Sequence, residues 1–146
     1  EVVRHPGAVM VVPVLDDGHA VLVRQYRAAI DTHLLEIPAG KRDIADEPPE
    51  LAAARELREE VGLEAGSLTL LSAFYNTPGF SDEHSYCFLG TACTEVDDSR
   101  QGLEEEHMTL ERVPLADVPA MVASGALIDA KSIIGLLLAR EHLGIT

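Results

Sequence analysis

Apolar and polar residues are distributed along the chain in segments that predict strands over much of its length. Two β-branched runs, 7–15 and 19–26, flank Asp16-Asp17-Gly18, which is typical of a tight turn between two antiparallel strands. Further strands are expected over 34–37, 67–75, 84–92 and 107–113. The pattern therefore predicts a sheet that opens with an antiparallel pair.

Helical patterns occupy the remaining ordered segments. The segment 49–61 is dense in strong helix formers, carries Pro in its first turn and is followed by Gly62. Helices are also expected over 115–124 and 129–143, the latter with Asp129 as its N-cap. Strands flanked by helices predict an α/β protein with a mixed sheet and packed helices.

The composition excludes several classes of protein. With 146 residues and 47% hydrophobic content, the chain fits one domain with a core, which argues against intrinsic disorder. Its net charge of -14 repels polyanions, so we expect no nucleic-acid partner. Without an apolar run of roughly 18 residues or a signal-peptide pattern, we expect no membrane association. Two cysteines are too few for a disulfide framework, so a soluble cytoplasmic protein is expected.

The helix predicted over 49–61 has an apolar side and a carboxylate side. At 100° per residue, Glu56, Glu59 and Glu60 share one arc, and the apolar positions Ala53, Ala54, Leu57 and Val61 share the adjoining arc. Three neighbouring acids repel one another if they are buried without cations. The alternative is a solvated face on which Arg55 and Arg58 form helical ion pairs.

Further oxygen donors precede this helix. Ala39-Gly40 follows a predicted strand, and Glu47 lies in the next loop, so backbone carbonyls and carboxylates can converge on one volume. Ligation by oxygen alone suits Mg²⁺ or Mn²⁺, which keep several waters and bridge to substrate phosphates. We therefore predict a hard divalent metal site.

The same residues resemble the Nudix box, G-x5-E-x7-R-E-U-x-E-E-x-G-U with U apolar. The matching positions are Gly40, Glu47, Arg55-Glu56-Leu57, Glu59-Glu60 and Gly62-Leu63. One departure is visible, because six residues instead of five separate Gly40 from Glu47. Asp46 would satisfy the first spacing but not the second, so we expect the loop to absorb the additional residue.

Resemblance to the Nudix family implies an α/β/α sandwich and hydrolysis of a nucleoside diphosphate linked to another moiety. It implies that Glu56, Glu60 and the Ala39 carbonyl bind the metal, and that Glu59 takes part. It gives Arg55 the task of orienting these acids through ion pairs, with a purely structural role as the alternative.

The segments 35–40 (LEIPAG) and 76–83 (NTPGFSDE) resemble the ADP-ribose pyrophosphatase branch of the family. That branch implies a homodimer that converts ADP-ribose, or a related nucleoside diphosphate sugar, to AMP and ribose 5-phosphate. The substrate-binding residues expected on this basis are Arg27, Glu36, Pro78, Gly79 and Glu83. For Pro78 and Gly79, the alternative is a simple turn between two strands. For Arg27, the alternative is a surface arginine at the end of a strand.

The acidic loop 104–106 supplies the expected general base. The branch implies a loop glutamate that activates water, and alignment from the following strand favours Glu104, with Glu106 next. The alternative is that the acids of this loop are simply exposed to solvent and that none of them is the base. Two rival functions remain open, namely a Nudix hydrolase for another nucleoside diphosphate derivative and a sensor that binds ADP-ribose without cleaving it.

We expect residues 1–146 to form a single domain. The N-terminal β-subdomain that the branch usually carries has no counterpart in these residues, although the first residue is Glu1 and an upstream segment stays open. The helix predicted over 129–143 is more apolar than one buried stripe requires, so it is either well buried or part of a dimer contact.

Overall fold

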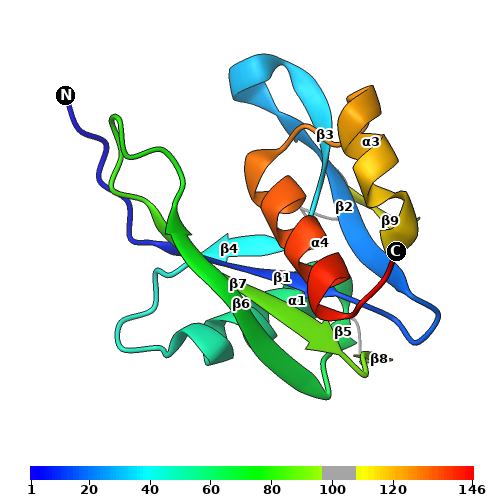
Figure 1. Ribbon diagram of the computed structural model, residues 1–146. Coiled ribbons are helices and arrows are strands. Elements are labelled where there is room, and N and C mark those ends of the chain that lie inside the picture. Colours follow the sequence, from blue (N-terminus) through cyan, green and yellow to red (C-terminus); the bar gives the residue numbers. More distant parts are fainter. Residues whose placement is uncertain (97–107) are drawn as a thin grey trace.

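In the computed structural model, which describes residues 1–96 and 108–146, strand β1 (Ala8–Pro13) is buried on both faces. Its odd-numbered valines pack in one cluster with helix α1 (Pro49–Val61). Residues 10 and 12 pack in another with helix α4 (Ala130–His142). Because successive side chains of a strand point to opposite faces, the two helices cover opposite faces of the sheet (Figure 1). The α/β sandwich expected from the sequence is confirmed.

In the described part of the chain, the strands form three sheets. The largest has the order β4-β1-β7-β6, formed by β4 (Ala39–Lys41), β1, β7 (His84–Thr91) and β6 (Ser67–Tyr75). It is mixed, since β1 and β7 are parallel and the other pairs are antiparallel. An antiparallel sheet has the order β3-β2-β9, formed by β3 (Thr32–Glu36), β2 (His19–Arg27) and β9 (Met108–Pro114). The third pairs β5 (Leu63–Glu64) with β8 (Thr94–Glu95).

The sequence predicted that the runs 7–15 and 19–26 pair as antiparallel strands, and this prediction is wrong beyond the turn that joins them. The turn is present, with Gly18 at φ 83° and the Leu15 N–H donating to the His19 carbonyl over 2.8 Å. Only one bridge, between Val14 and Ala20, joins the two runs in the described residues. Both edges of β1 are taken by β4 and β7, and both edges of β2 by β3 and β9, so the runs diverge into different sheets.

Helix α1 has the predicted bounds. It ends at Gly62, which adopts φ 67° and donates its N–H to the Arg58 carbonyl. The buried residues are Ala52, Ala53, Leu57 and Val61, so the prediction that Ala54 lies on the buried arc is wrong, and Ala52 is buried in its place. Ala52 lies one turn before Glu56, on the same side of α1. Because Ala52 is buried, other residues pack over this side of the helix in its first turns.

The C-terminal helices follow their predicted ranges with two refinements. The segment 115–124 begins as a 3-10 turn (Leu115–Asp117) and continues as α3 (Val118–Ser124). Asp129 caps α4 by accepting the Ser132 N–H, as predicted. A Cβ on Gly135 would lie 3.0–3.1 Å from Ile37, Cys87 and Val12, so the glycine lets α4 approach the sheet closely. Among the described residues, none of the helices is both long and apolar enough to cross a bilayer.

The remaining short elements were not predicted. They are β4, β5, β8 and a 3-10 turn (Ala28–Ile30) that joins β2 to β3. The predicted strand 107–113 is present as β9 from Met108, and residue 107 lies outside the described residues.

Candidate functional site

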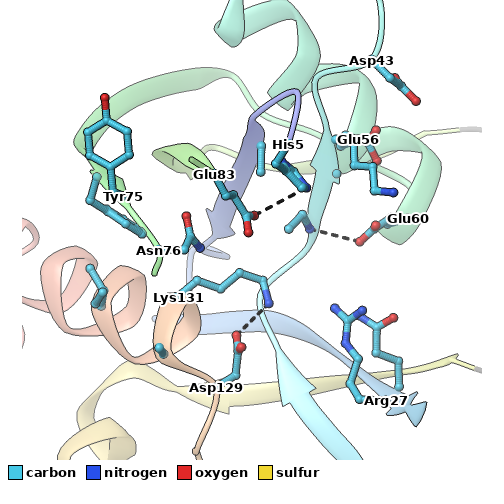
Figure 2. A pocket seen from close by; sticks show the side chains of 18 residues that line it. His5, Arg27, Asp43, Glu56, Glu60, Tyr75, Asn76, Glu83, Asp129 and Lys131 are labelled. Carbon is cyan, nitrogen blue, oxygen red and sulfur yellow. Dashed lines mark hydrogen bonds and ion pairs between the residues drawn. The ribbon is translucent and has the colours of Figure 1, made fainter. Parts of the chain in front are cut away.

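A cleft of about 630 Å³ opens beside the N-terminal ends of α4 and β4 (Figure 2). Charged and polar side chains from several elements line it, namely His5, Gln25, Arg27, Lys41, Asp43, Glu56, Glu60, Asn76, Glu83, Asp129 and Lys131. Acids of α1 form one wall, and Arg27 with Lys131 lies across from them. Such a cleft can bind an anionic ligand only where its cations, or added ones, meet the negative charge.

The acidic wall consists of Glu56 and Glu60, one helical turn apart in α1, against the backbone of β4. The Ala39 N–H donates to Glu60 Oε2 over 3.3 Å. A Cβ on Gly40 would lie 2.0 Å from Glu56 Cδ, so the carboxylate occupies the space that a side chain there would need. The strand backbone and the two carboxylates therefore converge on one side of the cleft.

Arg55 lies among the acids of the helix and the preceding loop. Its Nε and Nη2 donate to the Glu47 carboxylate over 3.1 and 3.0 Å. Its Nη1 donates to Glu56 Oε1 over 3.0 Å and to Glu59 Oε2 over 3.4 Å. Hydrogen bonding to Glu47 raises the pKa of Arg55, and the same bond holds the pKa of Glu47 below its usual range. One guanidinium thus orients three carboxylates, and Glu59 lies outside the cleft lining.

The loop between Gly40 and Glu47 accommodates its additional residue locally. Asp46 adopts a left-handed backbone with φ 63°, a conformation that Asp tolerates better than most residues. Glu47 then reaches Arg55, and its carbonyl accepts an N–H from Arg42 over 3.2 Å. The expectation that the loop would absorb the insertion without moving the helix agrees with this geometry.

The cationic side of the cleft is built on a buried acid. Glu36 is 0% exposed and accepts Nε and Nη2 of Arg27 over 2.8 and 2.7 Å. Lys131 Nζ donates to Glu36 Oε1 over 2.5 Å and to Asp129 Oδ2 over 2.9 Å. The bond to Glu36 raises the pKa of Arg27. Glu36, expected to bind substrate, therefore lies behind the lining and reaches the cleft through two cations.

The loop between β6 and β7 contributes a polar side. The Asn76 N–H donates to the Glu83 carbonyl over 3.2 Å, and Asn76 Oδ1 accepts from Ser85 over 2.6 Å. Glu83 and Asn76 line the cleft, whereas Pro78 and Gly79 are exposed and lie outside its lining. The structure thus brings Glu83 to the cleft but not the turn beside it.

Several polar lining residues were missed as site residues from the sequence, among them Lys131, Asp129 and His5. Lys131 and Asp129 lie in the first turn of α4, where the sequence showed only an N-cap. His5 is held at the cleft by its backbone N–H, which donates to the Asp82 carboxylate. Its ring Nε2 lies 3.8 Å from Glu83 Oε2. No local pattern marks these contacts, since each joins segments far apart in the chain.

The donor set fits a hard divalent cation that keeps several waters. Within residues 1–96 and 108–146, no three His, Cys, Asp or Glu side chains gather closely enough to hold a metal by themselves. Glu56, Glu60 and the adjacent Ala39 backbone nevertheless offer oxygens on one wall, and Mg²⁺ is commonly held by one or two carboxylates together with substrate phosphates. The expected general bases, Glu104 and Glu106, lie outside the described residues.

Comparison with known proteins adds an independent line of support. A family model of the NUDIX domain matches residues 4–134. The chain is 41% identical over 132 residues to an ADP-ribose pyrophosphatase of Bacillus subtilis (strain 168), with 90% of this chain and 71% of the relative aligned. It is 43% identical over 137 residues to an ADP-ribose pyrophosphatase of Mycobacterium tuberculosis (strain ATCC 25618 / H37Rv), covering 94% of this chain and 66% of that one. The crystal structure of an ADP compounds hydrolase matches with a TM-score of 0.83 and 30% identity, over 94% of this chain and 72% of the other.

Proposed function

The chain belongs to the Nudix family, and from this premise we propose that it hydrolyses the pyrophosphate of ADP-ribose, or of a related nucleoside diphosphate sugar, to AMP and ribose 5-phosphate. The observation that carries the proposal is the cleft itself, in which the acids of the Nudix box stand across from Arg27 and Lys131. The similarity to two ADP-ribose pyrophosphatases supports the substrate.

The size and polarity of the cleft agree with such a substrate. A volume of about 630 Å³ falls in the range of roughly 300–1,000 Å³ that small-molecule sites occupy. A diphosphate carries negative charge, which the guanidinium of Arg27 can neutralise through hydrogen bonds. We assign Arg27 to the nucleotide end of the substrate, and Glu83 to hydroxyl groups of the sugar end.

We propose that Glu56, Glu60 and the carbonyl of Ala39 hold Mg²⁺, with Mn²⁺ as the alternative. A divalent cation bound by these residues would supply positive charge against the phosphate oxygens and would lower the pKa of a bound water. Arg55 keeps Glu56 and Glu59 in place through its hydrogen bonds, so that the carboxylates need not reorganise when the substrate enters.

The general base proposed from the sequence is Glu104, with Glu106 as the alternative. Its carboxylate takes the proton of the attacking water while the cleft residues hold the diphosphate.

Product analysis tests the proposal directly. The purified protein is incubated with ADP-ribose, with and without Mg²⁺, and the products are identified by chromatography and mass spectrometry. AMP and ribose 5-phosphate in equal amounts, formed only with the metal, support it. A parallel panel of another nucleotide sugar, a dinucleotide polyphosphate and an oxidised nucleoside triphosphate decides whether a different derivative is cleaved faster, and binding of ADP-ribose without products would favour a sensor.

We further propose a cytoplasmic homodimer. The homodimer is what the resemblance to the ADP-ribose pyrophosphatase branch implies, and the partial exposure of Leu137 on α4, at 38%, supports assembly. Both cysteines, Cys87 and Cys93, are unpaired, which suits a reducing compartment. Light scattering coupled to gel filtration measures the mass, and a monomer at micromolar concentration would contradict the dimer.

A further inference from the structure

A cluster of alternating charges connects β2, β3 and α4 behind the cleft. Glu36 stands at its centre and is shared by Arg27 and Lys131. Lys131 also binds Asp129 (Figure 2). Side-chain exposure differs between the two cations, at 45% for Arg27 and 15% for Lys131. The cation that shields Glu36 from within the protein is therefore Lys131.

Lys131 separates two carboxylates that would otherwise repel each other. Its Nζ lies 2.5 Å from Glu36 Oε1 and 2.9 Å from Asp129 Oδ2, so the two acids are no farther apart than the sum of these distances. A buried carboxylate requires a paired cation, because desolvation strongly disfavours an unpaired charge. Without Lys131, Arg27 would be the cation left on Glu36, and repulsion between the two carboxylates would favour a shift of one of them.

Asp129 has further hydrogen bonds that do not involve Lys131 or Arg27. It caps α4 by accepting the Ser132 N–H over 3.2 Å, and it also accepts the Ser132 hydroxyl over 2.5 Å. The same hydroxyl oxygen accepts the Ile37 N–H over 2.9 Å, which ties this turn to the end of β3. Glu36, the residue before Ile37, is the acid that would shift, and Arg27 is bound to it.

We propose that Lys131 is a positioning residue for Arg27. By sharing Glu36 Oε1, Lys131 fixes the carboxylate so that it holds Nε and Nη2 of Arg27, and Nη1 is the guanidinium nitrogen that this pair leaves for a phosphate. The inference rests on the proposed function, in which Arg27 binds the nucleotide end of the substrate. It assigns to the first turn of α4 a part in substrate binding without contact with the substrate.

Arg112 offers a control for the loss of a positive charge, because it is exposed on β9 and lies outside the cleft lining. Lys131→Met and Arg112→Met each remove one positive charge. We expect Lys131→Met to raise KM about tenfold, the size of one charge-assisted hydrogen bond, with kcat within about twofold. Lys131→Arg should restore KM to within about threefold of the wild type, and Arg112→Met should change it by less than about threefold.

A double-mutant cycle separates positioning from direct contact. If Lys131 acts through Arg27, then Lys131→Met added to Arg27→Ala changes KM by less than about twofold. A further tenfold rise in the Arg27→Ala background would mean that Lys131 touches the substrate, and it would overturn the proposal. An unchanged KM in Lys131→Met alone would do the same.

The position of Arg27 can also be observed without any substrate. In ¹⁵N-labelled protein, the Arg27 Nε–H signal, assigned by its loss in Arg27→Ala, should shift or broaden in Lys131→Met and stay in place in Lys131→Arg and Arg112→Met. If Lys131→Met does not fold, Glu36→Gln should displace the same signal, and an unmoved signal in whichever variant folds overturns the proposal. Failure of the wild type to cleave any nucleoside diphosphate derivative would refute the proposed function, while this signal still decides the role of Lys131.

Discussion

The carboxylate of Glu56 fills the space above Gly40. A Cβ at residue 40 would lie 2.0 Å from Glu56 Cδ and 2.3 and 2.4 Å from its two carboxylate oxygens, which is closer than any real Cβ contact. Gly40 therefore permits the acid of α1 to lie directly against the β4 backbone. This contact, and not a turn, gives the glycine of the Nudix box its role in this protein.

Gly40→Ala should displace the Glu56 carboxylate while leaving the fold intact, because the clashing atoms belong to the end of a flexible side chain. A displacement of about 1 Å in a positioned group can lower a rate by about 100-fold. We expect a loss of that order in kcat/KM, together with weaker Mn²⁺ binding in calorimetry and a near-normal circular dichroism spectrum. Unchanged Mn²⁺ affinity would show that Glu56 does not hold the metal.

Glu60→Gln should lower kcat by about 100-fold or more, since it removes one negative charge from the proposed metal ligands and a cation supplies several kcal/mol of transition-state stabilisation. The matched control is Glu50→Gln, which makes the same change in the first, exposed turn of α1. Steady-state assays of both variants at saturating Mg²⁺ provide the comparison. Near-normal turnover of Glu60→Gln would remove this residue from the metal site.

The ion pair between Glu47 and Arg55 should stabilise the fold in a pH-dependent way. Because Arg55 holds the pKa of Glu47 below its usual range, the stabilisation is fully present above the unfolded pKa of about 4.3 and is lost as the pH falls through the lower folded value. The Tm difference between the wild type and Glu47→Gln should therefore shrink from pH 6 to pH 3. Calorimetry at several pH values measures it, and a difference that grows in acid would contradict the assignment.

Cys87 should resist alkylation in the native protein. Burial raises the pKa of Cys87 to about 12, so at pH 8 only about one thiol in 10,000 is ionised. Cys93 is only half-buried, although burial raises its pKa too. Iodoacetamide followed by mass spectrometry should modify Cys87 more slowly than Cys93, and both at similar rates in denaturant. Equal native rates would mean that the sheet opens readily beneath α4.

Local patterns predicted the elements that carry the acids. The bounds of α1 follow from its helix formers, its Pro at the start and Gly62 at the end, all within one segment. Resemblance to the Nudix box likewise grouped Glu56, Glu60 and Ala39 as metal-binding residues, and they share one wall of the cleft. For the bounds of α1 and for the metal-binding residues alike, the information lay within a short segment of the sequence.

Contacts between distant segments were not predictable in the same way. An Asp-Gly turn joins β1 to β2, but nothing local shows that β1 pairs with β4 and β7 instead. Glu36 and Lys131 are 95 residues apart, and their ion pair depends on the packing of α4 against the end of β3. The short strands β5 and β8 are held by pairing with each other, not by a hydrophobic alternation.

Anomalous scattering from crystals soaked in Mn²⁺ and a slowly hydrolysed ADP-ribose analogue tests the central claim most directly. The account predicts a manganese peak between the carboxylates of Glu56 and Glu60 and the Ala39 carbonyl, with diphosphate oxygens of the analogue completing its coordination. A bound analogue whose diphosphate lies away from α1, with no manganese beside Glu56 or Glu60, would contradict it.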